Sequence, residues 1–190
     1  MFKKIIKGEF NYLKRKKTRV IIITILYFAI ALGIITIGYI TTQTKRNLLT
    51  VVGILGCLPA CKSLVNMIML LLVKGCSCEN YEKINNIKYK FDIIYDMYFT
   101  SYNKNYLLSS LVVNNNRIIG FTEDNKMNID DCINHLNTML KNSGHKSVVI
   151  SITNDIDKYI GMLNNLNEEF NDENINKDDD ILLTLYEISI

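Results

Sequence analysis

Five thiols and two imidazoles are the most reactive side chains of this 190-residue chain, and their spacing does not assemble a site. An odd number of cysteines, spread over regions of different composition, argues against a disulfide framework and favours a reducing compartment. The cysteines at 76 and 78 raise two hypotheses, lipidation and weak metal capture, but a zinc site needs a nearby histidine or a second cysteine pair. The residues concerned are Cys57, Cys61, Cys76, Cys78, Cys132, His135 and His145.

Acidic side chains offer the other candidate chemistry, because paired carboxylates hold divalent cations or transfer protons. Asp92, Asp96 and Glu123 are the carboxylates whose convergence in one pocket would indicate an active site. The run Asp178–Asp180 lacks the alternating ligands and the glycine turn of a calcium loop, so we interpret it as part of a solvated linker. No nucleophile elbow, phosphate-binding loop, dinucleotide fingerprint or His-Glu-x-x-His motif is present. The sequence therefore predicts no catalytic, cofactor-binding or metal-binding residue and favours a protein that is not an enzyme.

Charge divides the chain into three regions. Residues 1–19 carry eight Lys or Arg and one Glu, residues 20–74 carry four basic residues and no acid, and residues 75–190 carry ten basic and eighteen acidic residues. A basic head, an apolar middle and an acidic tail are separate environments, so the net charge of +3 does not indicate nucleic-acid binding. The abundance of Asn, Ile and Lys indicates an AT-rich genome and a bacterial source.

The segment Val20–Ile40 has 21 residues without a charge. A helix rising about 1.5 Å per residue would carry this segment across the roughly 30 Å hydrocarbon core of a membrane. The segment exceeds the roughly 7–15 apolar residues of a signal peptide, and a second apolar segment follows it. We therefore expect a retained first transmembrane helix.

A second apolar stretch, Leu48–Val73, follows the polar connector Thr41–Asn47. Pro59 lacks the N–H of a helical residue, which predicts a kink or break near Leu58. We interpret the stretch as one kinked crossing, with a re-entrant loop as the alternative. Two hypotheses remain for Lys62: a functional contact in a homo-oligomer or substrate path, or a side chain that snorkels to the membrane surface.

Basic residues in short flanking segments stay on the cytoplasmic side of a membrane. Their distribution predicts a multi-pass protein of the cell membrane with both termini in the cytoplasm and the connector outside. The basic residues 1–19 are also expected to attract anionic lipids. Small residues four positions apart, Ala29 with Gly33 and Gly56 with Ala60, favour close helix packing within the hairpin or in a homo-oligomer.

Residues 74–190 are expected to form a cytoplasmic α/β (α+β) domain. Period-two alternation predicts strands, Asn114–Asn116 predicts a tight turn, and period 3.6 with capping residues predicts helices. Gly144 is the expected C-cap of the first of these helices. The expected elements are strands Lys88–Phe99, Tyr106–Val113 and Arg117–Glu123, a helix from Ile129 to Leu140, strand Lys146–Thr153, a helix from Ile156 to Leu166, a loop Asn167–Asp180 and strand Ile181–Ile190.

The predicted order is βββαβαβ, with a short helix at Glu79–Asn86 in front. This order is similar to the core of the PD-(D/E)xK nuclease-like fold over residues 79–153. That resemblance implies metal-dependent nuclease chemistry only with an acid-x-Lys pair on the third strand. Here Lys126 lies three positions after Glu123, and the residue two positions after it is Asn125. The active-site pattern is therefore missing.

These observations favour a membrane-anchored binding, scaffold or regulatory module with an unknown cytoplasmic protein partner. The alternatives are a membrane-tethered enzyme-like domain and a small transport-accessory or toxin-like membrane protein. The last alternative depends on functional roles for Lys62 and Pro59.

Overall fold

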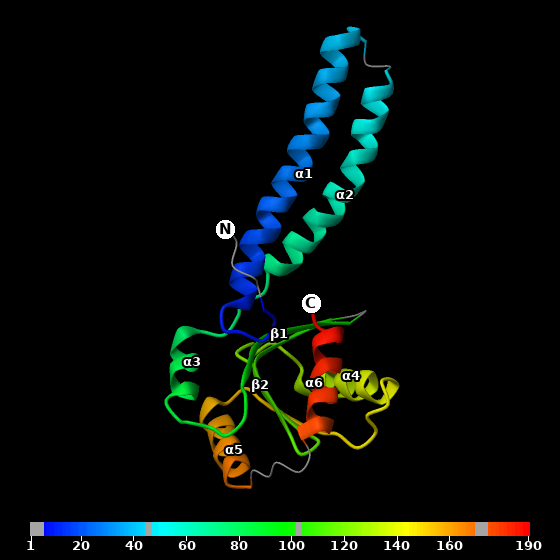
Figure 1. The fold of residues 1–190 in the computed structure, drawn as a ribbon. Helices are drawn as coiled ribbons and strands as arrows, with labels where there is room; N and C mark the ends of the chain where they lie inside the picture. Colours follow the sequence, from blue (N-terminus) through cyan, green and yellow to red (C-terminus); the bar gives the residue numbers. More distant parts are fainter. Residues whose placement is uncertain (1–5, 45–46, 102–103, 170–174) are drawn as a thin grey trace. The chain divides into compact units, whose positions relative to one another are not determined.

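The computed structural model describes residues 6–44, 47–101, 104–169 and 175–190. The chain forms two compact units, a helical hairpin and an α+β unit, and the hairpin interrupts the α+β unit in the sequence (Figure 1). Residues Leu13–Lys74 form the hairpin unit, and the residues up to Tyr12 together with Gly75–Ile190 form the second, here called the α+β unit.

The hairpin consists of α1 (Tyr12–Thr42) and α2 (Leu48–Leu71). Both helices are long and apolar enough to cross a membrane. Asn47 caps α2, and its side chain accepts a hydrogen bond from the N–H of Thr50. Pro59 lies inside α2, which continues through it as one helix, so the break that a re-entrant loop needs is absent from α2.

Small side chains form the contact between the two helices. Ala31 on α1 and Ala60 on α2 are buried, and the hydroxyls of Thr24 and Ser63 are 2.7 Å apart. A Cβ added at Gly53 would lie 2.3 Å from Cγ1 of Ile35, so α2 approaches α1 at a distance that only glycine permits. Of the small pairs expected from the sequence, Gly56 with Ala60 faces α1, whereas the position of Gly33 opens to empty space.

The α+β unit contains a four-stranded sheet in the order β1-β2-β3-β4. β1 (Ile94–Thr100), β2 (Asn105–Asn114) and β3 (Arg117–Phe121) are antiparallel, and β4 (Val149–Thr153) is parallel to β3. The expected turn between β2 and β3 is confirmed. Asn115 and Asn116 adopt φ values of 51° and 58°, as a two-residue hairpin turn requires.

Helices cover both faces of the sheet. On one face α4 (Ile129–Asn142) and α6 (Ile175–Ile188) pack on buried residues that include Leu111 and Ile118. On the other face α3 (Cys78–Asn85) and α5 (Ile156–Glu168) pack around Val112 and Phe121, and Figure 1 shows the helices separated by the sheet. The observed order is αβββαβαα, and the α+β class is confirmed.

The prediction of a final strand at Ile181–Ile190 is wrong, because these residues form most of α6 and its end. Ile181 and Leu185, one helical turn apart, are buried in the core. An apolar run of this length fits a buried strand and a buried helix equally well by composition. The predicted loop Asn167–Asp180 is also too long, since α6 begins at Ile175; residues 170–174 lie outside the described residues.

The prediction of one strand over Lys88–Phe99 with a single buried face is also wrong. The strand begins at Ile94, and the buried face changes along it: Tyr95 contributes to the α3/α5 side, whereas Met97 and Phe99 contribute to the α4/α6 side. The change occurs at Asp96, which adopts a φ of 57°. A strand in regular conformation would have kept these three side chains on one face.

Segments from both ends of the described chain complete the outer edge of β1. Gly8 forms a bridge with Tyr95, and Ser189 forms one with Phe99. The ammonium of Lys7 donates to the carbonyls of Tyr186 and Ser189, at 2.8 Å each, where α6 ends. The residues just before α1 are therefore structural parts of the α+β unit, and they cover an edge strand that would otherwise be open to pairing.

Candidate functional site

Asp96 is a buried carboxylate that binds the chain where it enters the α+β unit. Its side chain is 1% exposed and accepts a hydrogen bond of 2.8 Å from the N–H of Cys76. A Cβ added at Gly75 would lie 2.6 Å from the Asp96 carboxylate, so a glycine is required at this approach. A buried acceptor of this kind stabilises the fold only when donors satisfy it, and Asp96 makes further interactions besides this bond.

Glu123 binds the next residues of the same segment. One carboxylate oxygen accepts hydrogen bonds from the N–H of Ser77 at 2.9 Å and its hydroxyl at 3.0 Å, and from the amide of Asn80 at 2.9 Å. Ser77 is also the N-cap of α3, since its hydroxyl oxygen accepts the N–H of Asn80. Glu123 therefore fixes the start of α3 to the end of β3.

The two carboxylates affect the protonation of the Cys76 thiol. Burial and the charges of Glu123 and Asp96 raise the pKa of the Cys76 thiol, which keeps it protonated and unreactive. The third candidate acid, Asp92, is exposed and lies close enough to Tyr186 to affect its titration. The structure thus brings Asp96 and Glu123 to one segment and leaves Asp92 elsewhere.

This arrangement differs from a nuclease centre. The order α3-β1-β2-β3-α4-β4 agrees with the order on which the resemblance depends. However, Glu123 is occupied by donors from Ser77 and Asn80, and Lys126 is exposed in the loop after β3. The carboxylates hold a backbone segment, which is a structural role.

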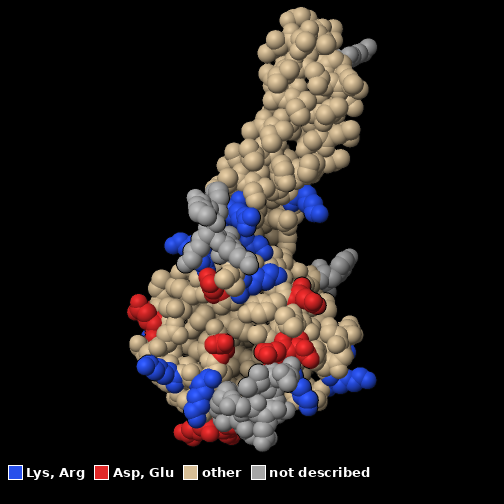
Figure 2. Space-filling model, in the orientation of Figure 1, with Lys and Arg blue, Asp and Glu red and all other residues tan. Residues whose placement is uncertain are grey.

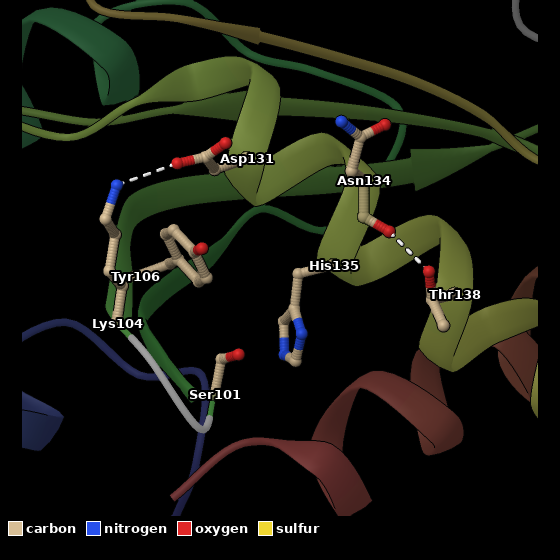
Figure 3. A pocket seen from close by; sticks show the side chains of 7 residues that line it. All are labelled: Ser101, Lys104, Tyr106, Asp131, Asn134, His135 and Thr138. Carbon is tan, nitrogen blue, oxygen red and sulfur yellow. Dashed lines mark hydrogen bonds and ion pairs between the residues drawn. The ribbon is translucent and has the colours of Figure 1, made fainter.

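A pocket of about 400 Å³ lies on the opposite side of the unit, between the β1–β2 end and one face of α4 (Figure 3). Side chains of both polar and aromatic character line it. They are Ser101, Lys104, Tyr106, Asp131, Asn134, His135 and Thr138.

The charged groups of this pocket neutralise each other. Lys104 and Asp131 form an ion pair of 2.8 Å, and the hydrogen bond to Asp131, together with its charge, raises the pKa of Lys104. The rings of Tyr106 and His135 lie with centroids 5.6 Å apart, and desolvation lowers the pKa of His135. Figure 3 shows Asp131 turned toward Lys104 and away from His135, so the pocket does not hold an acid-oriented histidine.

The remaining reactive groups are embedded in the fold. Cys132 is completely buried, and desolvation raises the pKa of its thiol to about 12. His145 is half-buried and its ring lies 3.1 Å from the hydroxyl of Thr184, so it is bound between elements. Within residues 6–44, 47–101, 104–169 and 175–190, no group of three or more His, Cys, Asp or Glu residues could hold a metal ion.

In the hairpin unit, Lys14, Arg19 and Lys74 lie near the end where the chain enters and leaves it. Gly56 contacts Ala31 and Ser63 contacts Thr24, and these two contacts fix the register of the antiparallel helices. Moving seven residues toward the start of α1 corresponds to moving seven residues toward the end of α2. Val20, where the apolar run begins, therefore lies level with Met67. Figure 2 shows an uncharged column with basic side chains at its lower end.

By this register, Lys62 lies five residues from the level of Val20, where the apolar run of α1 begins. Five residues correspond to about 7 to 8 Å along a helix. The side chain of Lys62 is exposed, and a lysine stem of four methylenes reaches outward over such a distance. Lys62 is therefore level with a position inside the apolar run of α1, within reach of the level of Val20.

Asp96 is the important residue whose role the sequence does not indicate. Its position in an apolar strand next to exposed polar residues suggests only an outward-facing side chain. The sole local signal is the Gly75-Cys76-Ser77 segment, whose glycine and helix-capping serine mark a tight connection. The comparisons add no relative: no family model, no curated protein and no solved structure matches this chain.

Proposed function

We propose that this chain is an integral membrane protein whose hairpin crosses the bilayer twice and anchors the α+β unit on the cytoplasmic side. The α+β unit acts there as a binding, scaffold or regulatory module for a partner protein. Neither candidate site presents a nucleophile with its base, and the buried carboxylates Asp96 and Glu123 hold backbone segments. These features support a binding role over a catalytic one.

One observation carries the membrane assignment: the large apolar side chains of the hairpin face outward. Leu32 is 58% exposed and Leu58 is 67% exposed, and comparable residues occur along both helices. Soluble proteins rarely expose contiguous apolar patches of more than a few hundred Å². A core helix of a soluble protein would bury these residues, whereas lipid chains solvate them at no cost.

The cytoplasmic orientation is supported by the position of the basic residues. Lys14, Arg19 and Lys74 lie at the end of the hairpin where the chain enters and leaves it. Basic residues next to membrane-crossing helices are retained in the cytoplasm.

Membrane integration and orientation are tested together in intact cells. Single cysteines replace two exposed residues, Thr42 and Ser143, in a background without the native thiols, because Cys132 is too deeply buried to serve as a probe. A membrane-impermeant maleimide should label position 42 in intact cells and position 143 only after lysis. The protein should also remain in the membrane fraction after alkaline carbonate extraction.

Two outcomes contradict the proposal in different ways. Release by carbonate would show that the hairpin does not span a bilayer. Labelling of position 143 in intact cells would place the α+β unit outside and reverse the orientation. Labelling of both positions after lysis is the control that each thiol is accessible.

A further inference from the structure

We propose that the basic end of the hairpin binds the phosphate groups of anionic phospholipids in one leaflet, and that Lys62 belongs to this binding surface. The surface, called the basic collar, consists of Lys14, Arg19, Lys62 and Lys74. This inference rests on the proposed membrane insertion of the hairpin. It goes further because it places the lipid-binding surface at the base of the hairpin and assigns a role in it to Lys62.

The register of the hairpin places Lys14 six residues and Arg19 one residue outside the level of Val20, and Lys62 five residues inside it, so the three are spread over about 16 Å along the hairpin. Lys62 lies about 7 to 8 Å inside the level of Val20, and its exposed side chain is long enough to span that distance. Arg19 directly precedes Val20, and Lys74 follows the end of α2. The ammonium of Lys17 donates to the carbonyl of Val73, which confirms that the basic turn of α1 lies beside the end of α2.

The hairpin unit itself supplies no acid to the collar. Between Phe10 and Cys78 there is no Asp or Glu, and the nearest acids in sequence are Glu9 and Glu79. All four collar side chains are exposed. Cations gathered in an apolar hairpin without neighbouring acids need counter-charges from the surroundings, and phosphodiester oxygens are the anions present at a membrane surface.

Apolar side chains among these cations favour a lipid over a nucleic acid or free phosphate. Ile68, Leu71 and Leu72 in and after the last turn of α2 are exposed, and Leu72 is 81% exposed. These residues lie beside the basic turn of α1. A surface with cations and exposed aliphatic side chains together matches the boundary between headgroups and acyl chains.

The test uses the full chain in nanodiscs that contain 30% phosphatidylglycerol in phosphatidylcholine. Native mass spectrometry counts the phosphatidylglycerol molecules retained on the protein. We expect enrichment above the bulk fraction for the wild type and loss of enrichment for the variant K14Q/R19Q/K62Q/K74Q. K62Q alone should weaken retention roughly five-fold, since one basic residue at the surface contributes about 1 kcal/mol.

The matched control is K126Q/K141Q/K146Q/K158Q, which removes the same charge from exposed positions of the α+β unit. It should retain lipid as the wild type does. If the wild type inserts into the nanodiscs but shows no enrichment of phosphatidylglycerol, this inference is overturned and the proposed membrane anchor stands. If the wild type does not insert, this inference and the proposed membrane anchor are both overturned. K62Q with wild-type retention would exclude Lys62 from the collar. Binding of inorganic phosphate in detergent without lipid preference would overturn the lipid assignment.

Discussion

The two units of this chain place the same types of apolar side chain in opposite environments: buried in the α+β unit and exposed on the hairpin. In the α+β unit leucines are buried and polar groups face outward, so the core determines the fold. In the hairpin leucines and isoleucines face outward, and the contact between the helices is made by glycine, alanine, serine and threonine. A leucine therefore contributes to the free energy of folding through burial in the α+β unit, but not in the hairpin unit, residues 13–74.

The largest expected contrast comes from one substitution made in both units. Leu111→Ala removes a completely buried side chain from β2 and should lower the free energy of unfolding of the α+β unit by about 2–5 kcal/mol. Leu32→Ala changes an exposed residue of α1 and should alter it by less than about 0.5 kcal/mol. Urea titration of the full protein in detergent, followed by near-ultraviolet circular dichroism of the tyrosines, measures both.

Equal losses for the two variants would contradict the division into differently solvated units. In particular, a large loss for Leu32→Ala would mean that the outer face of α1 is buried against protein.

The second contrast is inside the hairpin and should be somewhat smaller. Gly53→Leu places a side chain where a Cβ alone would already collide with Ile35, at a cost of about 1–3 kcal/mol in helix packing. Gly33→Leu is the matched control, because no atom lies within 4 Å of its Cβ position. Cysteines at positions 24 and 63, where the native hydroxyls are 2.7 Å apart, report the packing through disulfide formation.

We expect Gly53→Leu to reduce the yield of that disulfide and Gly33→Leu to leave it unchanged. A reduced yield for Gly33→Leu alone would mean that the helices pack through the opposite face of α1.

The parts of this structure that could be predicted from sequence are those set by residues close together in the chain. The apolar hairpin helices and the Asn115-Asn116 turn depend on residues within a few positions of one another, and both are present. The predicted end of α4 is also confirmed, since Gly144 adopts a φ of 97°.

The failures have causes that are distant in sequence. The change of face in β1 occurs at Asp96, whose carboxylate is held by the N–H of a residue twenty positions earlier. α6 is a helix because Ile181 and Leu185 pack on the sheet and Lys7 binds its end, which no local pattern shows. The carboxylates were identifiable as candidates, but their common target at residues 75–77 was not.

Glu123 provides a third and smaller contrast, between a carboxylate that holds the chain and one that does not. Glu123→Gln keeps the shape but removes the charge that strengthens three accepted hydrogen bonds, at a cost of about 1 kcal/mol. Hydrogen exchange of the peptide covering residues 75–85 should become faster. Glu82→Gln, an exposed position on α3, is the control and should leave exchange unchanged. Unchanged exchange in Glu123→Gln would show that the α3 start is held by other contacts.

The smallest expected effect concerns His135 in the pocket of the α+β unit. Desolvation lowers its pKa below the ordinary value of 6.5, so below that pH the unfolded chain binds more protons than the folded one. The free energy of unfolding should therefore rise with pH up to about 6.5 and lose this contribution as the solution is acidified. His135→Asn should remove that component of the pH dependence, measured by urea titrations between about pH 5 and 7.5. Thr138→Ala lines the same pocket without a titrating group and should keep the wild-type slope. An unchanged slope in His135→Asn would mean that the pocket does not desolvate this ring, and that the ring is as exposed as the outer face of the hairpin.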